Sequence, residues 1–167
     1  MLKITFVGNP INLLGTEIKV GDNAPNFSAL LKDLSSNELF SHENKIKVIT
    51  VFPSLDTPVC ATQVRNFNKE LGTISPDVVV LAISNDLPFA QTRFCTTEGI
   101  ENVVTLSDYR DNEFGLKYGF LIKELKLLAR GVVIVDKNNI VKYVEYVPEV
   151  THEVNFEAAI QTVKSLL

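Results

Sequence analysis

The fold is decided by residues 48–72, which read VITVFPSLDTPVCATQVRNFNKELG. The short β-branched run at 48–52 has no polar alternation, which is typical of a strand covered on both faces. A helix is predicted next, because Thr57 is a natural N-cap and Pro58 a natural first helical residue. Gly72 is placed to end this helix. Its apolar face, spaced at 3.6 residues per turn, consists of Cys60, Val64, Phe67 and Leu71.

Downstream of this helix, strand patterns alternate with helix patterns. Residues 78–83 and 103–106 predict two more buried strands. Between them we expect a helix over Pro88–Glu98, with a cap within residues 84–86 and a stop at Gly99. The later elements are a short helix at 112–118, a hairpin of strands 132–135 and 140–146, and an amphipathic helix at 155–167.

Upstream, the pattern predicts a β-hairpin around Gly8-Asn9-Pro10, with its second strand over residues 11–20. A loop and a short strand at 28–31 follow. Strands that alternate with helices and end in an antiparallel pair indicate an α/β fold, with a mixed sheet flanked by helices. A thioredoxin-like fold is the best match, with residues 1–167 as a single domain and 1–20 as an N-terminal β-hairpin.

Composition and charge exclude several classes of function. Hydrophobic residues make up 46% and charged residues 22%, as in soluble globular proteins that need no disulfide or metal to fold. The net charge is −4, and the basic residues, densest at 45–47 and 123–126, form no stripe for nucleic acid. No apolar run could span a bilayer, and the first one breaks at Gly8, too early for a secretory signal. We therefore expect a cytoplasmic protein with no membrane partner.

The chain has two cysteines and two histidines. No two of them stand at the short spacings of a zinc site, so no metal is expected. In a reducing cytoplasm, two cysteines are usually free thiols or a working redox pair.

Cys60 falls in the first turn of a predicted helix that follows a buried strand. Unpaired backbone N–H groups and the helix dipole favour a thiolate at such a position, and the thiolate is the nucleophilic form. The alternative is a small buried hydrophobic residue on the core face of the helix, where free cysteines commonly lie. Position alone leaves both interpretations open.

Pro53, Thr57 and Cys60 form the pattern P-x-x-x-T-x-x-C, which resembles the active-site signature of the peroxiredoxins. The fuller run at 53–63, PSLDTPVCATQ, is similar to the thiol peroxidase branch of that family, an atypical two-cysteine branch. The resemblance covers nearly the whole chain, including the N-terminal hairpin that this branch adds to the thioredoxin-like core. It continues at 87–95 (LPFAQTRFC), 98–103 (EGIENV), 105–111 (TLSDYRD) and 127–130 (LLAR).

The resemblance implies a role for each matching residue. Cys60 corresponds to the peroxidatic cysteine, which attacks a peroxide oxygen and becomes a sulfenic acid. Thr57 corresponds to the residue whose hydroxyl bonds the thiolate and the peroxide, and Pro53 to the one that shields the pocket from water. Arg130 corresponds to the arginine that keeps the thiolate ionised and orients the peroxide. Gly131 departs from the family pattern, and we expect it to loosen the backbone that carries Arg130.

Each of these residues also has a purely structural interpretation. Thr57 is a natural helix cap, Pro53 could simply end a strand, and an exposed arginine is ordinary where Arg130 stands. Together with Cys60, the functional interpretation is the better one.

Cys95 corresponds to the resolving cysteine, which attacks the Cys60 sulfenic acid within the same chain. A disulfide needs Cα atoms within about 7 Å, so we hypothesise that oxidation unwinds the chain locally around both cysteines. The structural alternative is a core cysteine on an apolar helix face beside Phe94.

The resemblance implies a peroxidase that reduces hydrogen peroxide and organic hydroperoxides, with thioredoxin as reductant, a homodimer as working unit and no cofactor. A thioredoxin-type oxidoreductase would share the fold but usually has C-x-x-C, and position 63 is Gln63. A redox sensor or chaperone that uses the two cysteines as a switch is another alternative, and an inert binding domain is a third. Peroxide turnover with a thiol reductant distinguishes the peroxidase from all of them.

Overall fold

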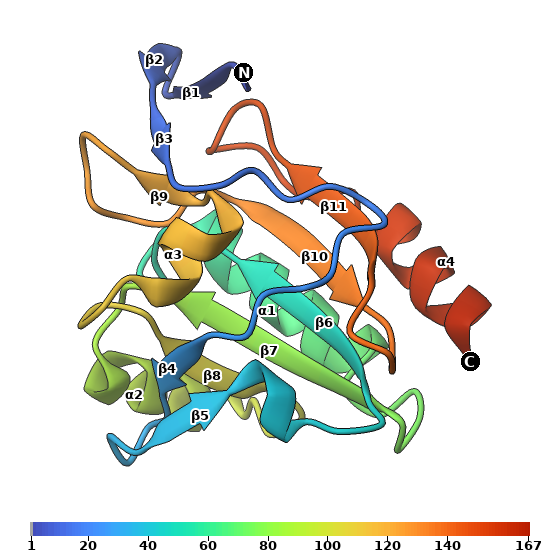
Figure 1. Cartoon of the computed structure of the whole chain (residues 1–167). Helices are drawn as coiled ribbons and strands as arrows, with labels where there is room; N and C mark the ends of the chain where they lie inside the picture. Colours follow the sequence, from blue (N-terminus) through green and yellow to red (C-terminus); the bar gives the residue numbers. More distant parts are fainter. Residues whose placement is uncertain (1) are drawn as a thin grey trace.

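The computed structural model describes residues 2–167, and a mixed seven-stranded sheet runs through its centre (Figure 1). Three parallel strands form the middle of the sheet, and antiparallel strands extend it on both sides. This arrangement confirms the predicted thioredoxin-like fold. In order across the sheet, the strands are β11 (Val141–Tyr146), β10 (Gly131–Val135), β6 (Ile46–Val51), β7 (Val78–Ser84), β8 (Val104–Ser107), β4 (Ser28–Leu30) and β5 (Ser36–Glu38).

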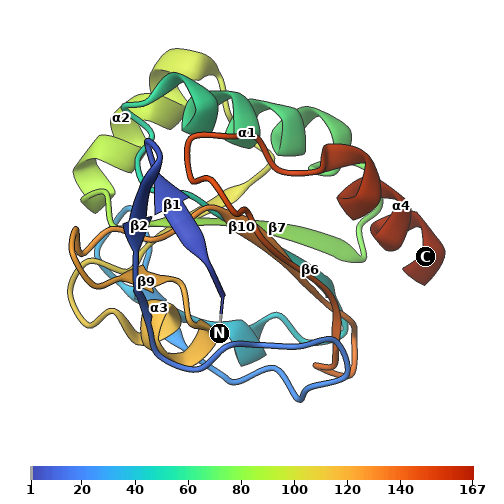
Figure 2. The same ribbon diagram turned by 90° about the horizontal axis from the view of Figure 1, so that it is seen from above.

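Helices cover both faces of this sheet (Figure 2). The helices α1 (Pro58–Glu70), α2 (Pro88–Glu98) and α4 (Phe156–Leu166) lie on one face. The short helix α3 (Glu113–Tyr118) lies on the other, and a 3-10 turn at Leu39–Ser41 follows β5.

The helix ends follow the predictions only in part. Thr57 occupies the N-cap position of α1, but its side chain accepts no hydrogen bond from the helix. Leu87, and not a residue within 84–86, is the N-cap of α2, because Pro88 already takes the first helical position. Gly99 ends α2 in the left-handed conformation, with a φ of 66°. Helix α1 ends at Glu70, and its C-cap is Leu71 in a right-handed conformation, so the helix stops before the predicted Gly72.

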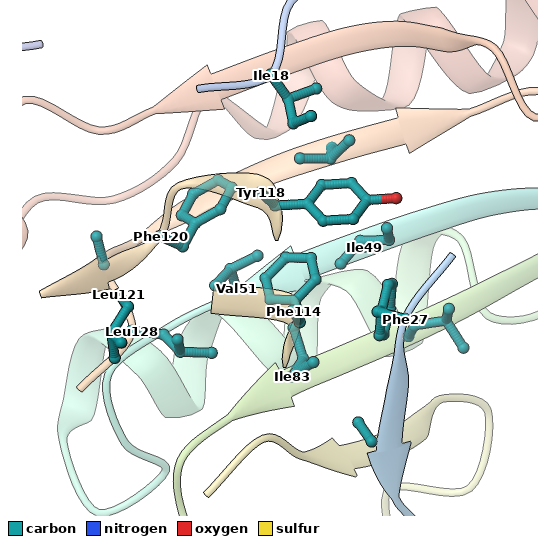
Figure 3. Packing of buried hydrophobic residues seen from close by; sticks show 14 of the residues in the cluster. Ile18, Phe27, Ile49, Val51, Ile83, Phe114, Tyr118, Phe120, Leu121 and Leu128 are labelled. Atoms are coloured by element: carbon teal, nitrogen blue, oxygen red, sulfur yellow. The ribbon is translucent and has the colours of Figure 1, made fainter. Parts of the chain in front are cut away.

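The central strands pack apolar side chains on both faces, as their continuous hydrophobic runs predict. In β6, Ile46 and Val48 lie on the face covered by α1 and α4, where Phe67 and Val163 belong to the same cluster. Ile49 and Val51 belong to the cluster on the opposite face, where aromatic rings from three segments meet (Figure 3). Those rings are Phe27, Phe114, Tyr118 and Phe120. Each such fully buried side chain contributes about 1.5–3 kcal/mol to stability.

The N-terminal hairpin is present but shorter than predicted. Its strands are β1 (Ile4–Phe6) and β2 (Asn9–Ile11), joined at Val7 and Gly8, which both have positive φ. The predicted second strand over residues 11–20 is wrong. The next strand, β3 (Leu13–Leu14), pairs instead with β9 (Leu121–Ile122), a pair of two-residue strands that carries no sequence pattern of its own. Beyond it, Gly15 has a φ of 98° and lies against the backbone of α3, which turns the chain away from a hairpin.

Glu149 ties this hairpin to the loop that follows β11. Its carboxylate accepts hydrogen bonds from the Thr5 hydroxyl (2.9 Å) and from the N–H groups of Val7 (3.2 Å) and Gly8 (2.7 Å). Hydrogen bonds from Thr151 and Gly8 hold the pKa of Glu149 well below its usual range. The docked hairpin brings Phe6 to the edge of the cavity described below.

Gly131 is tightly packed, which contradicts the expectation that it loosens the backbone beside Arg130. It lies in β10, paired with Val51 on one side and Tyr146 on the other. A Cβ atom at this position would overlap the Glu145 carbonyl oxygen and the Phe120 ring. The glycine is therefore required by the close approach of β11 and Phe120 to β10.

We predict that Gly131→Ala lowers the free energy of unfolding by about 1–3 kcal/mol, because backbone or ring must shift to accept the methyl group. Urea unfolding of the reduced protein measures this. Gly8→Ala is the comparison, since open space surrounds Gly8 and only its φ of 78° opposes a side chain. Equal stability of Gly131→Ala and the native chain would show that a methyl group fits at this position of β10 without strain, which would contradict this account.

Candidate active site

Cys60 is fully buried in the first turn of α1. The first turn offers backbone N–H groups without helical partners, and the helix dipole is positive there. Cys60 belongs to an apolar cluster at the start of α1 and the end of the parallel strands. The other buried members are Phe52, Leu55, Val64, Ala82 and Ile100.

Arg130 reaches Cys60 from the residue just before β10. Side chains alternate along this strand, so Arg130 shares a face with Val132 and Ile134, the face that α1 and α4 cover. Its side chain is 2% exposed and makes three hydrogen bonds. It donates to the Cys60 sulfur (3.1 Å), to Gln63 Oε1 (2.8 Å) and to the Val150 carbonyl (2.7 Å). The alternative of an ordinary exposed arginine is therefore wrong.

The Cys60 sulfur is the acceptor that can balance the charge of Arg130. A buried guanidinium without an opposite charge is unfavourable by several kcal/mol. Two of its three acceptors, the Gln63 amide and the Val150 carbonyl, are neutral groups. The third is a sulfur that becomes an anion when it loses its proton. A guanidinium fixed against a sulfur in this way can stabilise the deprotonated form of a cysteine, which is the nucleophilic form.

Gln63 belongs to the site, and the sequence analysis did not find it. It is 1% exposed, and its amide nitrogen donates to the Thr50 hydroxyl (2.6 Å) and the Val51 carbonyl (3.0 Å). Its amide oxygen accepts from Arg130, so it fixes the guanidinium against β6. The available signal was its position: three residues after Cys60, Gln63 falls on the same side of the helix.

Pro53 and Thr57 line a cavity that includes neighbours of Cys60, while the cysteine itself is fully buried behind it. The cavity has a volume of about 190 Å³, and Arg130 is part of its wall. Thr57 does not use its hydroxyl on the Cys60 sulfur here, because that hydroxyl donates to the Ser54 carbonyl (2.9 Å). The remaining wall is mostly apolar and consists of Phe6, Pro58, Val59, Val150 and Thr151.

Cys95 lies in the last turn of α2, half-buried against the apolar cluster that holds Cys60. Both cysteines are free thiols. Burial raises the pKa of the Cys95 thiol, and the charge of Lys32 offsets this in part. The fold therefore brings both predicted cysteines to one cluster without joining them.

Within residues 2–167, no three His, Cys, Asp or Glu side chains gather closely enough to hold a metal ion. No helix in this part of the chain is both long and apolar enough to cross a membrane.

Comparisons with known proteins agree with this geometry. Residues 19–160 match the model of the Redoxin family. The chain is 51% identical to the thiol peroxidase of Halalkalibacterium halodurans, over the full length of both chains. It is 49% identical to the thiol peroxidase of Listeria innocua, with 98% of this chain and 99% of the relative covered.

A solved structure, a peroxiredoxin-like protein from Aquifex aeolicus, superimposes with a TM-score of 0.93 at 41% identity. The match covers 100% of this chain and 98% of that one. The chain therefore belongs to the Redoxin family and, within it, to the thiol peroxidases, enzymes that use a cysteine thiol to reduce peroxides.

Proposed function

We propose that Cys60 is the peroxidatic cysteine and Cys95 the resolving cysteine of this peroxidase. The Cys60 thiolate attacks one oxygen of the hydroperoxide, the O–O bond breaks, and Cys60 becomes a sulfenic acid. The other oxygen leaves as alkoxide or hydroxide and takes a proton from water. The Cys95 sulfur then attacks the Cys60 sulfur, a disulfide forms, and water leaves.

The observation that carries this proposal is the 3.1 Å hydrogen bond from Arg130 to the Cys60 sulfur. The same guanidinium forms part of the cavity wall, so it also lies within reach of a peroxide bound there. A fixed positive charge at this point stabilises the thiolate before the reaction and the leaving oxygen during it.

We assign supporting roles to Pro53 and Thr57. Pro53 is buried at the cavity wall, where an apolar ring excludes water from the sulfur and from the sulfenic acid. Thr57 lines the same cavity, and its hydroxyl oxygen retains lone pairs that accept a hydrogen bond from the peroxide. In the reduced structure, that hydroxyl is held in place by the Ser54 carbonyl.

Closing the disulfide requires both cysteines to leave regular helix. Cys60 stands at the start of α1 and Cys95 near the end of α2, and both pack into one apolar cluster. Local unwinding of these two helix ends brings the sulfurs together while the sheet stays intact.

The remaining partners follow from the family. We propose thioredoxin as the reductant of the disulfide and a homodimer as the working unit, acting in the cytoplasm, with residues 1–167 as one domain. The substrates are hydrogen peroxide and organic hydroperoxides, and the chemistry takes place on the two sulfurs.

Intact mass tests the two cysteine roles. We expect one equivalent of hydroperoxide to remove two hydrogens from the reduced chain and to leave no thiol for alkylation under denaturing conditions. Cys95→Ser is expected to gain one oxygen at Cys60 instead, which dimedone traps. Cys60→Ser is expected to stay unoxidised. Equal oxidation of Cys60→Ser and native protein would refute the assignment of Cys60.

The pH dependence of disulfide closure tests the unwinding step. Because burial raises the pKa of Cys95, attack from the reduced position would accelerate with pH well beyond the ordinary thiol pKa of about 8.5. In our proposal, the unwound form predominates once Cys60 is a sulfenic acid, so Cys95 is no longer buried and regains the ordinary thiol pKa. We therefore expect the closure rate after one peroxide pulse to be half-maximal near pH ~8.5, measured by acid quench and mass. A half-maximal point well above this pH would mean that Cys95 attacks from its buried position.

A further inference from the structure

Asp86 lies between β7 and α2, and its carboxylate accepts three hydrogen bonds. Oδ1 accepts from the Ser54 hydroxyl (2.7 Å), while Oδ2 accepts from the Leu55 N–H (2.8 Å) and the Ser84 hydroxyl (2.8 Å). Two of these donors belong to the turn between Pro53 and Thr57, which leads into α1. The carboxylate is therefore an anchor for the segment that precedes Cys60.

The turn that Asp86 anchors also holds Thr57. The Ser54 carbonyl accepts hydrogen bonds from both the hydroxyl (2.9 Å) and the N–H (3.3 Å) of Thr57. Asp86 thus fixes Ser54, and Ser54 fixes Thr57, which lines the cavity beside Arg130.

On its other side, Asp86 is linked to the helix that carries Cys95. The Ser84 hydroxyl that donates to Asp86 also accepts from the side-chain amide of Gln91 (3.2 Å), which lies one turn before Cys95. The Asp86 carbonyl accepts from the Ser107 hydroxyl at the end of β8. One residue therefore connects the segment before Cys60, the ends of two central strands and the start of α2.

We propose that Asp86 is a positioning residue that sets the balance between the two halves of the catalytic cycle. Its carboxylate holds the reduced site in the form that reacts with peroxide, and its bonds to Ser54 and Leu55 must break before the disulfide closes. This inference rests on the proposed roles of Cys60 and Cys95. It adds a residue that touches neither sulfur and restrains the segment before Cys60.

Removal of the carboxylate should change the two steps in opposite directions. In Asp86→Ala, we expect oxidation of Cys60 by peroxide to slow by about tenfold, because Thr57 and the turn lose their anchor. Closure of the disulfide should accelerate by about tenfold, because fewer bonds oppose unwinding. Overoxidation of Cys60 at excess peroxide should fall, since the sulfenic acid is consumed faster.

Asp86→Asn should give an intermediate result. The Leu55 N–H is a fixed donor, but the hydroxyl of Ser54 can turn and accept from an amide nitrogen. Asparagine can therefore rebuild part of the hydrogen-bond network, which an apolar side chain of similar size could not do. Ser54→Ala removes one hydrogen bond of the same carboxylate. It should shift both rates in the same directions as Asp86→Ala but by a smaller factor. If Asp86→Ala does not fold, Ser54→Ala provides the test.

Quenched-flow mass spectrometry resolves the two steps in each variant. Asp56→Asn is the matched control, because Asp56 lies exposed in the same turn, and its carboxylate makes a long ion pair with Arg93 (3.9 Å) and no other contact of this kind within residues 2–167. Both of its rates should equal those of the native chain.

Three results would overturn the inference. The first is that Asp86→Ala and Asp56→Asn have the same two rates. The second is that Asp86→Ala slows both steps and also lowers the melting temperature, and the third is that it changes one step alone. Failure of the native chain to form the disulfide would instead refute the proposed function, and this inference with it.

Discussion

The guanidinium of Arg130 lies out of water against the Cys60 sulfur, and the rest of the site is arranged around keeping that charge in place. A buried cation is stable only where its donors are satisfied and an opposite charge is near. The Val150 carbonyl and Gln63 satisfy two donors, and the third acceptor, the Cys60 sulfur, is a group that can become an anion. The position of Arg130 in turn depends on the close packing of β10, where only glycine fits at position 131.

In the proposed cycle, the same site holds two conformations of one chain. Peroxide reduction needs a rigid pocket, whereas the disulfide that we propose would form after the start of α1 and the end of α2 unwind. The central sheet buries side chains on both faces, whereas the turn that leads into α1 is held largely by hydrogen bonds. Hydrogen bonds suit this purpose, because each one stabilises the fold by only about 1 kcal/mol and can be exchanged for water. Asp86 collects three such bonds on one carboxylate.

Local patterns in the sequence predicted the elements around Cys60 well, because Pro58 and the apolar spacing of α1 act within a few residues. The pairing of β3 with β9 could not be predicted, since two-residue strands have no periodicity. The polar contacts of Gln63 and Asp86 were also missed, because hydrogen bonds between distant segments depend on strand register. The resemblance to a family supplied the roles of Arg130 and Cys95, while the structure shows how their side chains are held.

The claim that Arg130 activates Cys60 is tested most directly by the rate at which hydroperoxide oxidises Cys60 in Arg130→Lys. Lysine keeps the charge but cannot make the three fixed hydrogen bonds. We expect the rate to fall about 10²-fold or more. Arg65→Lys is the control, because Arg65 lies on α1 in an exposed pair with Glu98, and its rate should stay native. A native rate in folded Arg130→Lys would contradict the account, because the fixed guanidinium would then not be what makes the sulfur reactive.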